Sequence, residues 1–345
     1  MNYTDSYLYD LAKIQNVIPN IDMLKGKSIF ITGASGLIGS AIVDFLIELN
    51  DSRKYQINIY VAGRHYEKIK NRFKERMNRS DIHYVEYDAC LPINFEEKIN
   101  YLIHGASNAN PATYISQPVE TMLANFTGLQ NLLEYARICG AERVLYISSS
   151  EVYGKKKNNL SYEEEDYNFL DILNPRACYP SSKRAAETLC VAYQNEYNVN
   201  TVIVRPGHVY GPTMTQEDNR AASQFARDVV NGKNIVMKSA GDQLRSYCYV
   251  LDAVSAIITV LLNGNGGEAY NISNSESIVT IRELAECFAE LGNKSIKFEI
   301  PTKTETASYN LMDNSSLSSV KLESLGWHGL FSLKEGVKAT LIELM

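Results

Sequence analysis

Two residues near the middle of the chain have the types and the spacing of a proton-transfer pair. Tyr179 and Lys183 are four positions apart in Tyr-Pro-Ser-Ser-Lys, so on a helix they share one face. A lysine ammonium beside a phenol favours the phenolate, which predicts a lowered pKa for Tyr179 and a general base near neutral pH. The same spacing recurs at Tyr9/Lys13, Tyr66/Lys70 and Tyr153/Lys157. We select Tyr179 because it follows a hydroxyl-rich strand end and precedes a predicted long helix over 182–194.

That strand end is Ser148-Ser-Ser-Glu, behind a predicted strand over 143–148. It delivers Ser149, Ser150 and Glu151 to the carboxyl edge of a sheet, where ligands bind in α/β folds. We expect Ser149 to share a substrate proton with Tyr179, and Ser150 to contact substrate. Glu151 is a candidate acid or base for a second chemical step, with a helix or turn cap as the alternative.

A glycine-rich turn follows the apolar run Ser28-Ile-Phe-Ile-Thr32 and opens an amphipathic helix. Gly33 can adopt the positive φ that the turn needs, Gly36 lets a pyrophosphate approach, and Gly39 lets the helix pack closely on the strand. The N–H groups at the helix start then face the phosphates. The alternative is a purely structural turn. We predict that a dinucleotide is bound by Gly33, Ser35, Gly36, Leu37, Ile38 and Gly39.

The residues after the next strands bear on the choice of dinucleotide. NAD-preferring folds place Asp or Glu at the end of the second strand, where this chain has Gly63-Arg64. Arg64 could bind the 2′-phosphate of NADP, stack on adenine or lie on the surface, so we expect NAD without excluding NADP. Asp88 is expected to contact the adenine. The remaining predicted cofactor contacts are Ala89, Ala106 and Lys183, and no metal site is predicted.

Composition argues against several classes of partner. The chain has 345 residues and a net charge of -6, which gives no reason to expect nucleic acid or an anionic membrane surface. No apolar run reaches the roughly 18 residues that span a bilayer, and no signal pattern begins the chain. Six scattered cysteines without a CxxC pair favour free thiols in a reducing cytosol. We therefore expect a cytoplasmic protein.

The chain between these motifs alternates strands with helices, which predicts an α/β fold with a doubly wound, Rossmann-type parallel sheet. The predicted strands are 29–32, 57–62, 83–87, 101–104, 143–148 and 201–205. We expect a helical extension over 1–26, a dinucleotide-binding lobe over 27–206 and a smaller, intertwined α+β substrate lobe over 207–345. Thr280-Ile-Arg-Glu283 and Ser332-Leu-Lys-Glu335 predict capping boxes. The acidic run 163–166 is interpreted as solvated surface.

At these residues the chain resembles extended short-chain dehydrogenases/reductases of the nucleotide-sugar epimerase/dehydratase family, from about residue 27 to near its C-terminus. Ser148-Ser-Ser-Glu-Val-Tyr-Gly and Asn174-Pro-Arg-Ala-Cys-Tyr-Pro-Ser-Ser-Lys are most similar to UDP-glucuronate decarboxylases. The resemblance implies that Ser149 stands for the catalytic threonine of that group, and that Glu151, Tyr179 and Lys183 match its catalytic residues. Arg245 matches an arginine near the substrate phosphates and sugar.

Two positions depart from the family pattern. Its Arg-x-x-Asn-x-x-Gly reads Arg205-Pro-Gly-His208-Val-Tyr-Gly here, and Thr213 stands where the decarboxylases have arginine. His208 is therefore either a substrate contact or a filler, and the pocket could accept another nucleotide or sugar. Ser-Glu at the strand end also occurs in GDP-mannose dehydratases, so dehydration stays open.

The resemblance implies an enzyme that oxidises the 4-hydroxyl of a nucleotide-sugar to a ketone with NAD. Carbon dioxide or water can then leave, or the ketone can be reduced on its other face. The alternatives are an NADP-dependent keto-sugar reductase, supported by Arg64, and a non-catalytic redox sensor, which has no need of a phenolate. By analogy alone we expect a homodimer formed by helices around 115–137 and 182–194, and a role in polysaccharide biosynthesis.

Overall fold

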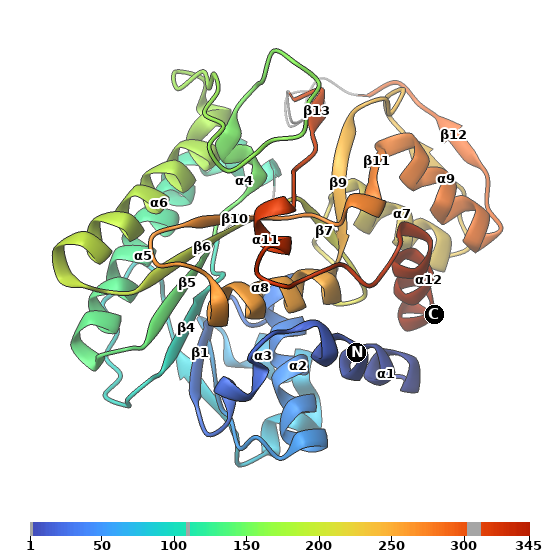
Figure 1. Cartoon of the computed structure of the whole chain (residues 1–345). Helices are drawn as coiled ribbons and strands as arrows, with labels where there is room; N and C mark the ends of the chain where they lie inside the picture. Colours follow the sequence, from blue (N-terminus) through green and yellow to red (C-terminus); the bar gives the residue numbers. More distant parts are fainter. Residues whose placement is uncertain (1–2, 108–110, 302–311) are drawn as a thin grey trace.

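The computed structural model describes residues 3–107, 111–301 and 312–345 (Figure 1). Its centre is a seven-stranded sheet in the order β10-β6-β5-β4-β1-β2-β3, and every printed register in it is parallel. The strands are β1 (Ser28–Thr32), β2 (Asn58–Gly63), β3 (Ile82–Glu86), β4 (Tyr101–His104), β5 (Arg143–Ile147), β6 (Thr201–Pro206) and β10 (Ala269–Ile272). This is the doubly wound architecture that the alternating pattern predicts.

Helices cover both faces of the sheet because the strands are apolar on both sides. In β1, Ile29 and Ile31 point into one core with α2 and α8, whereas Phe30 points into the other core with α5 and α6. Such burial on two faces is why these strands are nearly continuous apolar runs. The helices are α1 (Asp5–Ile14), α2 (Leu37–Arg53), α3 (Tyr66–Phe73), α4 (Pro111–Ser116), α5 (Pro118–Cys139), α6 (Cys178–Tyr197), α7 (Ala221–Val230), α8 (Val250–Asn263), α9 (Ile281–Gly292), α11 (Val320–Glu323) and α12 (Leu333–Leu344).

A smaller part of the molecule lies beside the sheet and carries α7, α9 and α12 (Figure 1). Its strands are β7 (His208–Tyr210), β8 (Ile235–Met237), β9 (Leu244–Tyr249), β11 (Ile278–Thr280), β12 (Ile296–Phe298) and β13 (Asn314–Ser315). Strand β9 is central, because β7, β11 and β13 all pair with it. The two predicted capping boxes are present at Thr280 and Ser332 and open α9 and α12.

The chain crosses between these two parts more than once. Strand β10 returns to the main sheet and pairs with β6, and α8 packs under that sheet. Strand β10 is the strand that the sequence prediction missed. It is four residues long, reads Ala-Tyr-Asn-Ile, and its partner β6 lies far earlier in the chain. The division into lobes at residue 206 stays a prediction.

The N-terminal extension is helical, as predicted, and packs on the main body. Leu11 and Ile14 of α1 are fully buried, and α1 lies against α2, α8 and α12. The fully buried carboxylate of Asp44 in α2 accepts hydrogen bonds from Tyr3 and Tyr7 and pairs with Arg72 at 2.6 Å. Among the described residues, no helix is long and apolar enough to cross a membrane.

Candidate active site

The predicted ligand residues meet because the strands that precede them are parallel. Gly33 follows β1, Arg64 follows β2, Asp88 comes soon after β3, Ala106 follows β4 and Ser149 follows β5. The carboxyl ends of parallel strands lie at one edge of a sheet. The structure therefore brings the two motifs, which are far apart in the sequence, to the same edge.

The glycine loop has the close backbone approach that its sequence predicts. Gly33 has φ of +70°, and a side chain there would lie 2.7 Å from the backbone of Gly105. A Cβ on Gly39 would lie under 3.0 Å from the carbonyl oxygen of Gly33, so the first turn of α2 is pressed against the loop. At Gly36 a Cβ would meet a single atom, at 3.3 Å. Only Gly33 and Gly39 are therefore required by packing within the protein itself.

Helix α2 begins at Leu37 with Gly36 as its N-cap, and no side chain caps its first N–H groups. Uncapped N–H groups at a helix start bind phosphate oxygens well. The loop is braced from two sides. Thr32 accepts hydrogen bonds from the N–H of Gly105 and Ala106 at 3.2 and 3.1 Å, and Thr213 donates to the carbonyl of Leu37 at 2.8 Å. This arrangement fits the pyrophosphate of a dinucleotide. It also gives Thr213 a structural partner.

The other predicted cofactor residues line the same edge. Arg64 is exposed directly after β2, where it is free to reach a ligand. Asp88 is half-buried and accepts the N–H of Cys90 at 2.9 Å. Ala89 packs against Gly128 of α5, where a Cβ would lie 2.8 Å away. Their positions at this edge fit an adenosine site.

Tyr179 and Lys183 both lie in α6, which begins at Cys178, earlier than the predicted start at residue 182. Both side chains are buried, at 6% and 3% exposure. The ammonium of Lys183 donates to the carbonyl of Ile147 at 2.8 Å and lies 5.7 Å from the ring centroid of Tyr179. The helix thus holds the pair on one face, with the lysine anchored to the end of β5.

The prediction of a lowered pKa for Tyr179 is wrong for the protein by itself. Burial, and secondarily the charge of Glu151, raise this pKa to about 12, although hydrogen bonds with Ser149 and Tyr114 act to lower it. Burial also lowers the pKa of Lys183 to about 7. The spacing predicts only the effect of the lysine charge. Burial also removes water from both groups, and this desolvation disfavours their charged forms.

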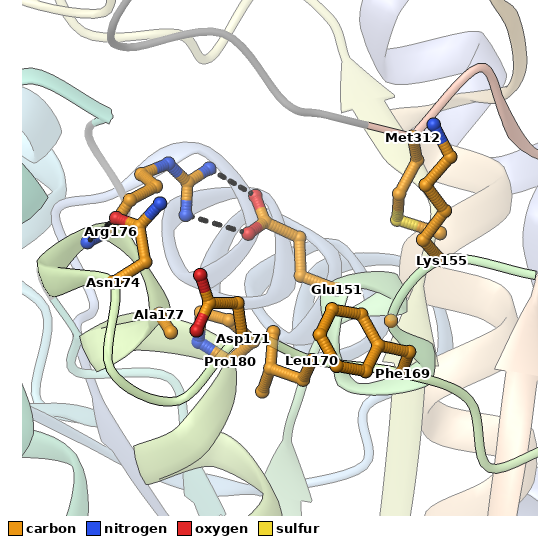
Figure 2. A pocket seen from close by; sticks show the side chains of 11 residues that line it. Glu151, Lys155, Phe169, Leu170, Asp171, Asn174, Arg176, Ala177, Pro180 and Met312 are labelled. Atoms are coloured by element: carbon orange, nitrogen blue, oxygen red, sulfur yellow. Dashed lines mark hydrogen bonds and ion pairs between the residues drawn. The ribbon is translucent and has the colours of Figure 1, made fainter.

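The hydroxyl and carboxyl groups after β5 are held by a 3₁₀ helix over Ser150–Tyr153. Ser149 caps this helix by accepting the N–H of Glu151 at 3.2 Å, and its hydroxyl also hydrogen-bonds Tyr179. The side chain of Ser150 is buried. The carboxylate of Glu151 forms a two-point ion pair with Arg176, at 2.9 and 3.0 Å (Figure 2). Among the described residues, the printed partner of this carboxylate is the Arg176 side chain and not the backbone N–H of a helix or turn.

Two further residues surround the tyrosine and were not singled out from the sequence. Tyr114 of α4 stacks on Tyr179, with ring centroids 4.4 Å apart and an interplanar angle of 12°. The guanidinium of Arg176 lies 4.8 Å from the ring centroid of Tyr114. Arg176 stands three positions before Tyr179 in the quoted motif, so the motif could have indicated it as a site residue. For Tyr114 no such signal exists, because its contact depends on how α4 folds back.

The predicted substrate contacts His208 and Arg245 lie on neighbouring strands, β7 and β9. Burial and the charges of Arg245 and Arg220 lower the pKa of His208 to about 3, so this imidazole is neutral. Its Nδ1 is buried and finds no hydrogen-bond partner within the described parts of the chain. The charge of Arg220 also acts to lower the pKa of Tyr179. Arg220, which the sequence reasoning missed, therefore links the tyrosine to the predicted substrate contacts.

A pocket of about 140 Å³ adjoins Glu151 and Arg176 (Figure 2). It is lined by Glu151, Gly154, Lys155, Phe169, Leu170, Asp171, Asn174, Arg176, Ala177, Pro180 and Met312.

Throughout the described ranges, no group of three or more His, Cys, Asp or Glu residues is arranged to hold a metal ion.

The sequence profile of the NAD dependent epimerase/dehydratase family matches residues 29–273, which cover both motifs and six of the seven strands completely. The chain belongs to this family. It is therefore an enzyme of the epimerase/dehydratase kind, and NAD is its cofactor.

Similar proteins include UDP-glucuronic acid decarboxylases. It is 33% identical to UDP-glucuronic acid decarboxylase 3 of Arabidopsis thaliana, over 90% of this chain and 86% of that protein. It is 29% identical to UDP-glucuronic acid decarboxylase 1 of Xenopus tropicalis, over 91% and 71%.

Solved structures of the same fold include UDP-glucose 4-epimerase of Thermotoga maritima, with a TM-score of 0.77 and 23% identity over 92% of this chain and 98% of that one. They also include the dTDP-glucose 4,6-dehydratase DesIV of Streptomyces venezuelae, with a TM-score of 0.77 and 22% identity over 92% and 96%. At this identity the likeness concerns the fold.

Proposed function

We propose that this protein decarboxylates UDP-glucuronate through a 4-keto intermediate. The observation that carries the proposal is the cluster of Ser149, Glu151, Tyr179 and Lys183 at one sheet edge, in a chain whose relatives named UDP-glucuronic acid decarboxylases match along about nine-tenths of its length.

In the proposed reaction, Tyr179 takes the proton of the sugar 4-hydroxyl, and Ser149 hydrogen-bonds the same oxygen. NAD held by the glycine loop would supply the hydride acceptor for C4 and, once reduced, the hydride donor that restores C4 at the end. The 4-ketone lets the C5 carboxylate leave as carbon dioxide, because the electron pair left on C5 is delocalised onto the ketone oxygen. C5 then takes up a proton, and we assign the handling of that proton to Glu151. The proton held by Tyr179 returns to the oxygen on C4.

Three cationic or polar side chains support an anionic substrate. The net charge of the protein is -6, so a UDP group must be held by local positive charges. The charges of Arg245 and Arg220 both lower the pKa of His208. We infer that Arg245 faces the diphosphate or the sugar and that neutral His208 offers a hydrogen bond beside it. Arg220 is paired with Asp218 at 2.5 Å, so we expect it to contribute hydrogen bonds more than net charge.

A mass-spectrometric screen tests this function. The purified protein is incubated with NAD and separately with UDP-glucuronate, UDP-glucose, dTDP-glucose, GDP-mannose and UDP-N-acetylglucosamine. We expect UDP-glucuronate to lose carbon dioxide without net consumption of NAD. Loss of water from another sugar nucleotide would instead make the protein a dehydratase. A change that occurs only with added NADPH would make it a reductase, and epimers resolved by chromatography would make it an epimerase.

We further propose that the protein is a homodimer built on α5 and α6, which lie side by side. Large apolar side chains on α4 and α5 are exposed, and unpartnered apolar helix faces mark association surfaces. They are Ile115, Val119, Met122, Leu123 and Phe126. Sedimentation should give a dimer for the unmodified protein and a monomer for Phe126→Glu. Ile342→Glu, an exposed apolar position on α12, should stay dimeric.

We also infer a cytoplasmic enzyme whose product serves polysaccharide biosynthesis. The support for the compartment is that all six cysteines are free thiols. Fractionation of cells followed by detection of the protein tests the compartment.

A further inference from the structure

Arg176 is bound to the candidate acid–base residue but does not belong to the predicted catalytic set. Its two terminal nitrogens donate to the two carboxylate oxygens of Glu151 at 2.9 and 3.0 Å. The two side chains are mostly buried, with 12% and 20% exposure. Two-point pairing of this kind fixes the position of a carboxylate as well as its charge. Arg176 therefore determines where Glu151 lies (Figure 2).

Glu151 acts electrostatically on the reaction centre. Its negative charge is the largest contribution after burial to the raised pKa of Tyr179. A substrate sugar must come within reach of Tyr179, so a carboxylate on that sugar would enter the field of Glu151. Two like charges repel strongly in a partly buried site, because water and salt screen them poorly there. A site with Glu151 alone would therefore disfavour an acidic sugar.

The guanidinium of Arg176 offsets this repulsion between carboxylates, because the Arg176–Glu151 pair has no net charge. We propose that Arg176 is a positioning residue that neutralises Glu151 and so makes the site accept a sugar with its own carboxylate. This inference rests on the proposed function, since a neutral sugar has no need of such compensation. Arg176 is expected to act through Glu151, because the two-point pair joins its guanidinium directly to that carboxylate.

The test is the ratio of two dissociation constants, for UDP-glucuronate and for UDP-glucose, measured by calorimetry on the protein loaded with NADH, which cannot accept a hydride and therefore prevents turnover. The two ligands differ in charge at C6 and share the UDP group. Arg176→Gln should weaken UDP-glucuronate binding by about tenfold or more, while UDP-glucose changes by less than about twofold. Removing the negative charge as well, in the double variant with Glu151→Gln, should restore UDP-glucuronate binding to within about threefold of the unmodified protein.

Arg184→Gln is the matched control. Arg184 lies in α6, after the 3₁₀ helix Pro175–Ala177 that carries Arg176, and it donates to the backbone carbonyls of Val152 and Asn168 at 2.5 and 3.0 Å, so this variant also removes one charge and two backbone contacts. Its ratio of dissociation constants should equal that of the unmodified protein. Glu151→Gln alone should not weaken UDP-glucuronate binding, which keeps the inference testable even if Arg176→Gln does not fold.

Three results would overturn the inference. The ratio could stay unchanged in Arg176→Gln, or Glu151→Gln could by itself weaken UDP-glucuronate binding tenfold. The double variant could also fail to regain affinity, which would mean that Arg176 contacts the substrate carboxylate directly. Failure of the proposed function looks different, because the unmodified protein would then release no carbon dioxide from UDP-glucuronate, whatever the variants bind.

Discussion

Lys183, which we propose as a catalytic residue, is expected to lower the stability of the folded protein. Its ammonium is buried, and burial lowers its pKa from 10.5 to about 7. The folded protein therefore binds this proton more weakly than the unfolded chain does. Replacing the lysine with methionine, which has a similar size and no charge, should stabilise the protein at neutral pH while turnover is lost.

The magnitude follows from the pKa difference. The pKa of Lys183 falls from 10.5 to about 7 on folding, which corresponds to a destabilisation of the folded protein by about 5 kcal/mol. This destabilisation is complete below pH 7 and disappears as the pH rises toward 10.5. The lost hydrogen bond to Ile147 offsets roughly 1–3 kcal/mol of this. At pH 6 we therefore expect Lys183→Met to be more stable than the unmodified protein by about 2–4 kcal/mol. By pH 9 the advantage should shrink by roughly 2–3 kcal/mol.

Urea unfolding without NAD, at pH 6, 7.5 and 9, measures this directly. Lys68→Met, an exposed lysine after β2, is the control and should show no such pH-dependent gain. The reasoning would be refuted if Lys183→Met were less stable than the unmodified protein at pH 6. A gain in stability of the same size at every pH would refute it as well, because the gain would then not come from the charge.

Other substitutions test the remaining parts of the site. Tyr179→Phe should abolish turnover while NAD still binds, measured by calorimetry; near-normal turnover would show that another group is the base. Gly39→Ala should lower the free energy of unfolding by about 1–3 kcal/mol and weaken NAD binding, because its Cβ meets the carbonyl of Gly33. Unchanged stability would mean that the loop gives way easily. Glu187→Gln should cost about 3–5 kcal/mol in urea unfolding, because it leaves the buried Arg205, now paired at 2.6 Å, without a counter-charge. A loss below about 1 kcal/mol would show that water reaches Arg205.

Strands of the main sheet could be predicted where the local pattern was strong. Six of them were placed within a residue or so, because each is a short apolar run between helices. The seventh, β10, is short and polar in part, and only its pairing with β6 makes it a strand. The acidic run at 163–166 was interpreted as solvated, yet Glu164 is buried and accepts the N–H of Asn271 at 2.7 Å. That contact joins segments far apart in the chain.

The residues of the candidate site also fall into those that local sequence patterns indicate and those that only tertiary contacts bring together. Tyr179, Lys183 and the glycine loop could be singled out as candidates from the sequence because their spacing along one helix or turn is a local property. The pairing of Arg176 with Glu151 and the stacking of Tyr114 on Tyr179 join segments from different elements. No local pattern encodes those distances.

The sequence by itself determined the fold class, and it marked the glycine loop and the pair Tyr179 and Lys183 as candidates, because backbone angles, helix periodicity and strand ends are set by near neighbours. Only the tertiary structure decided the charges in the site. Burial lowers the pKa of Lys183 and raises that of Tyr179, opposite to what their spacing alone predicts for the tyrosine. The physical reason is that desolvation depends on every group packed around a side chain, and those groups come from the whole chain.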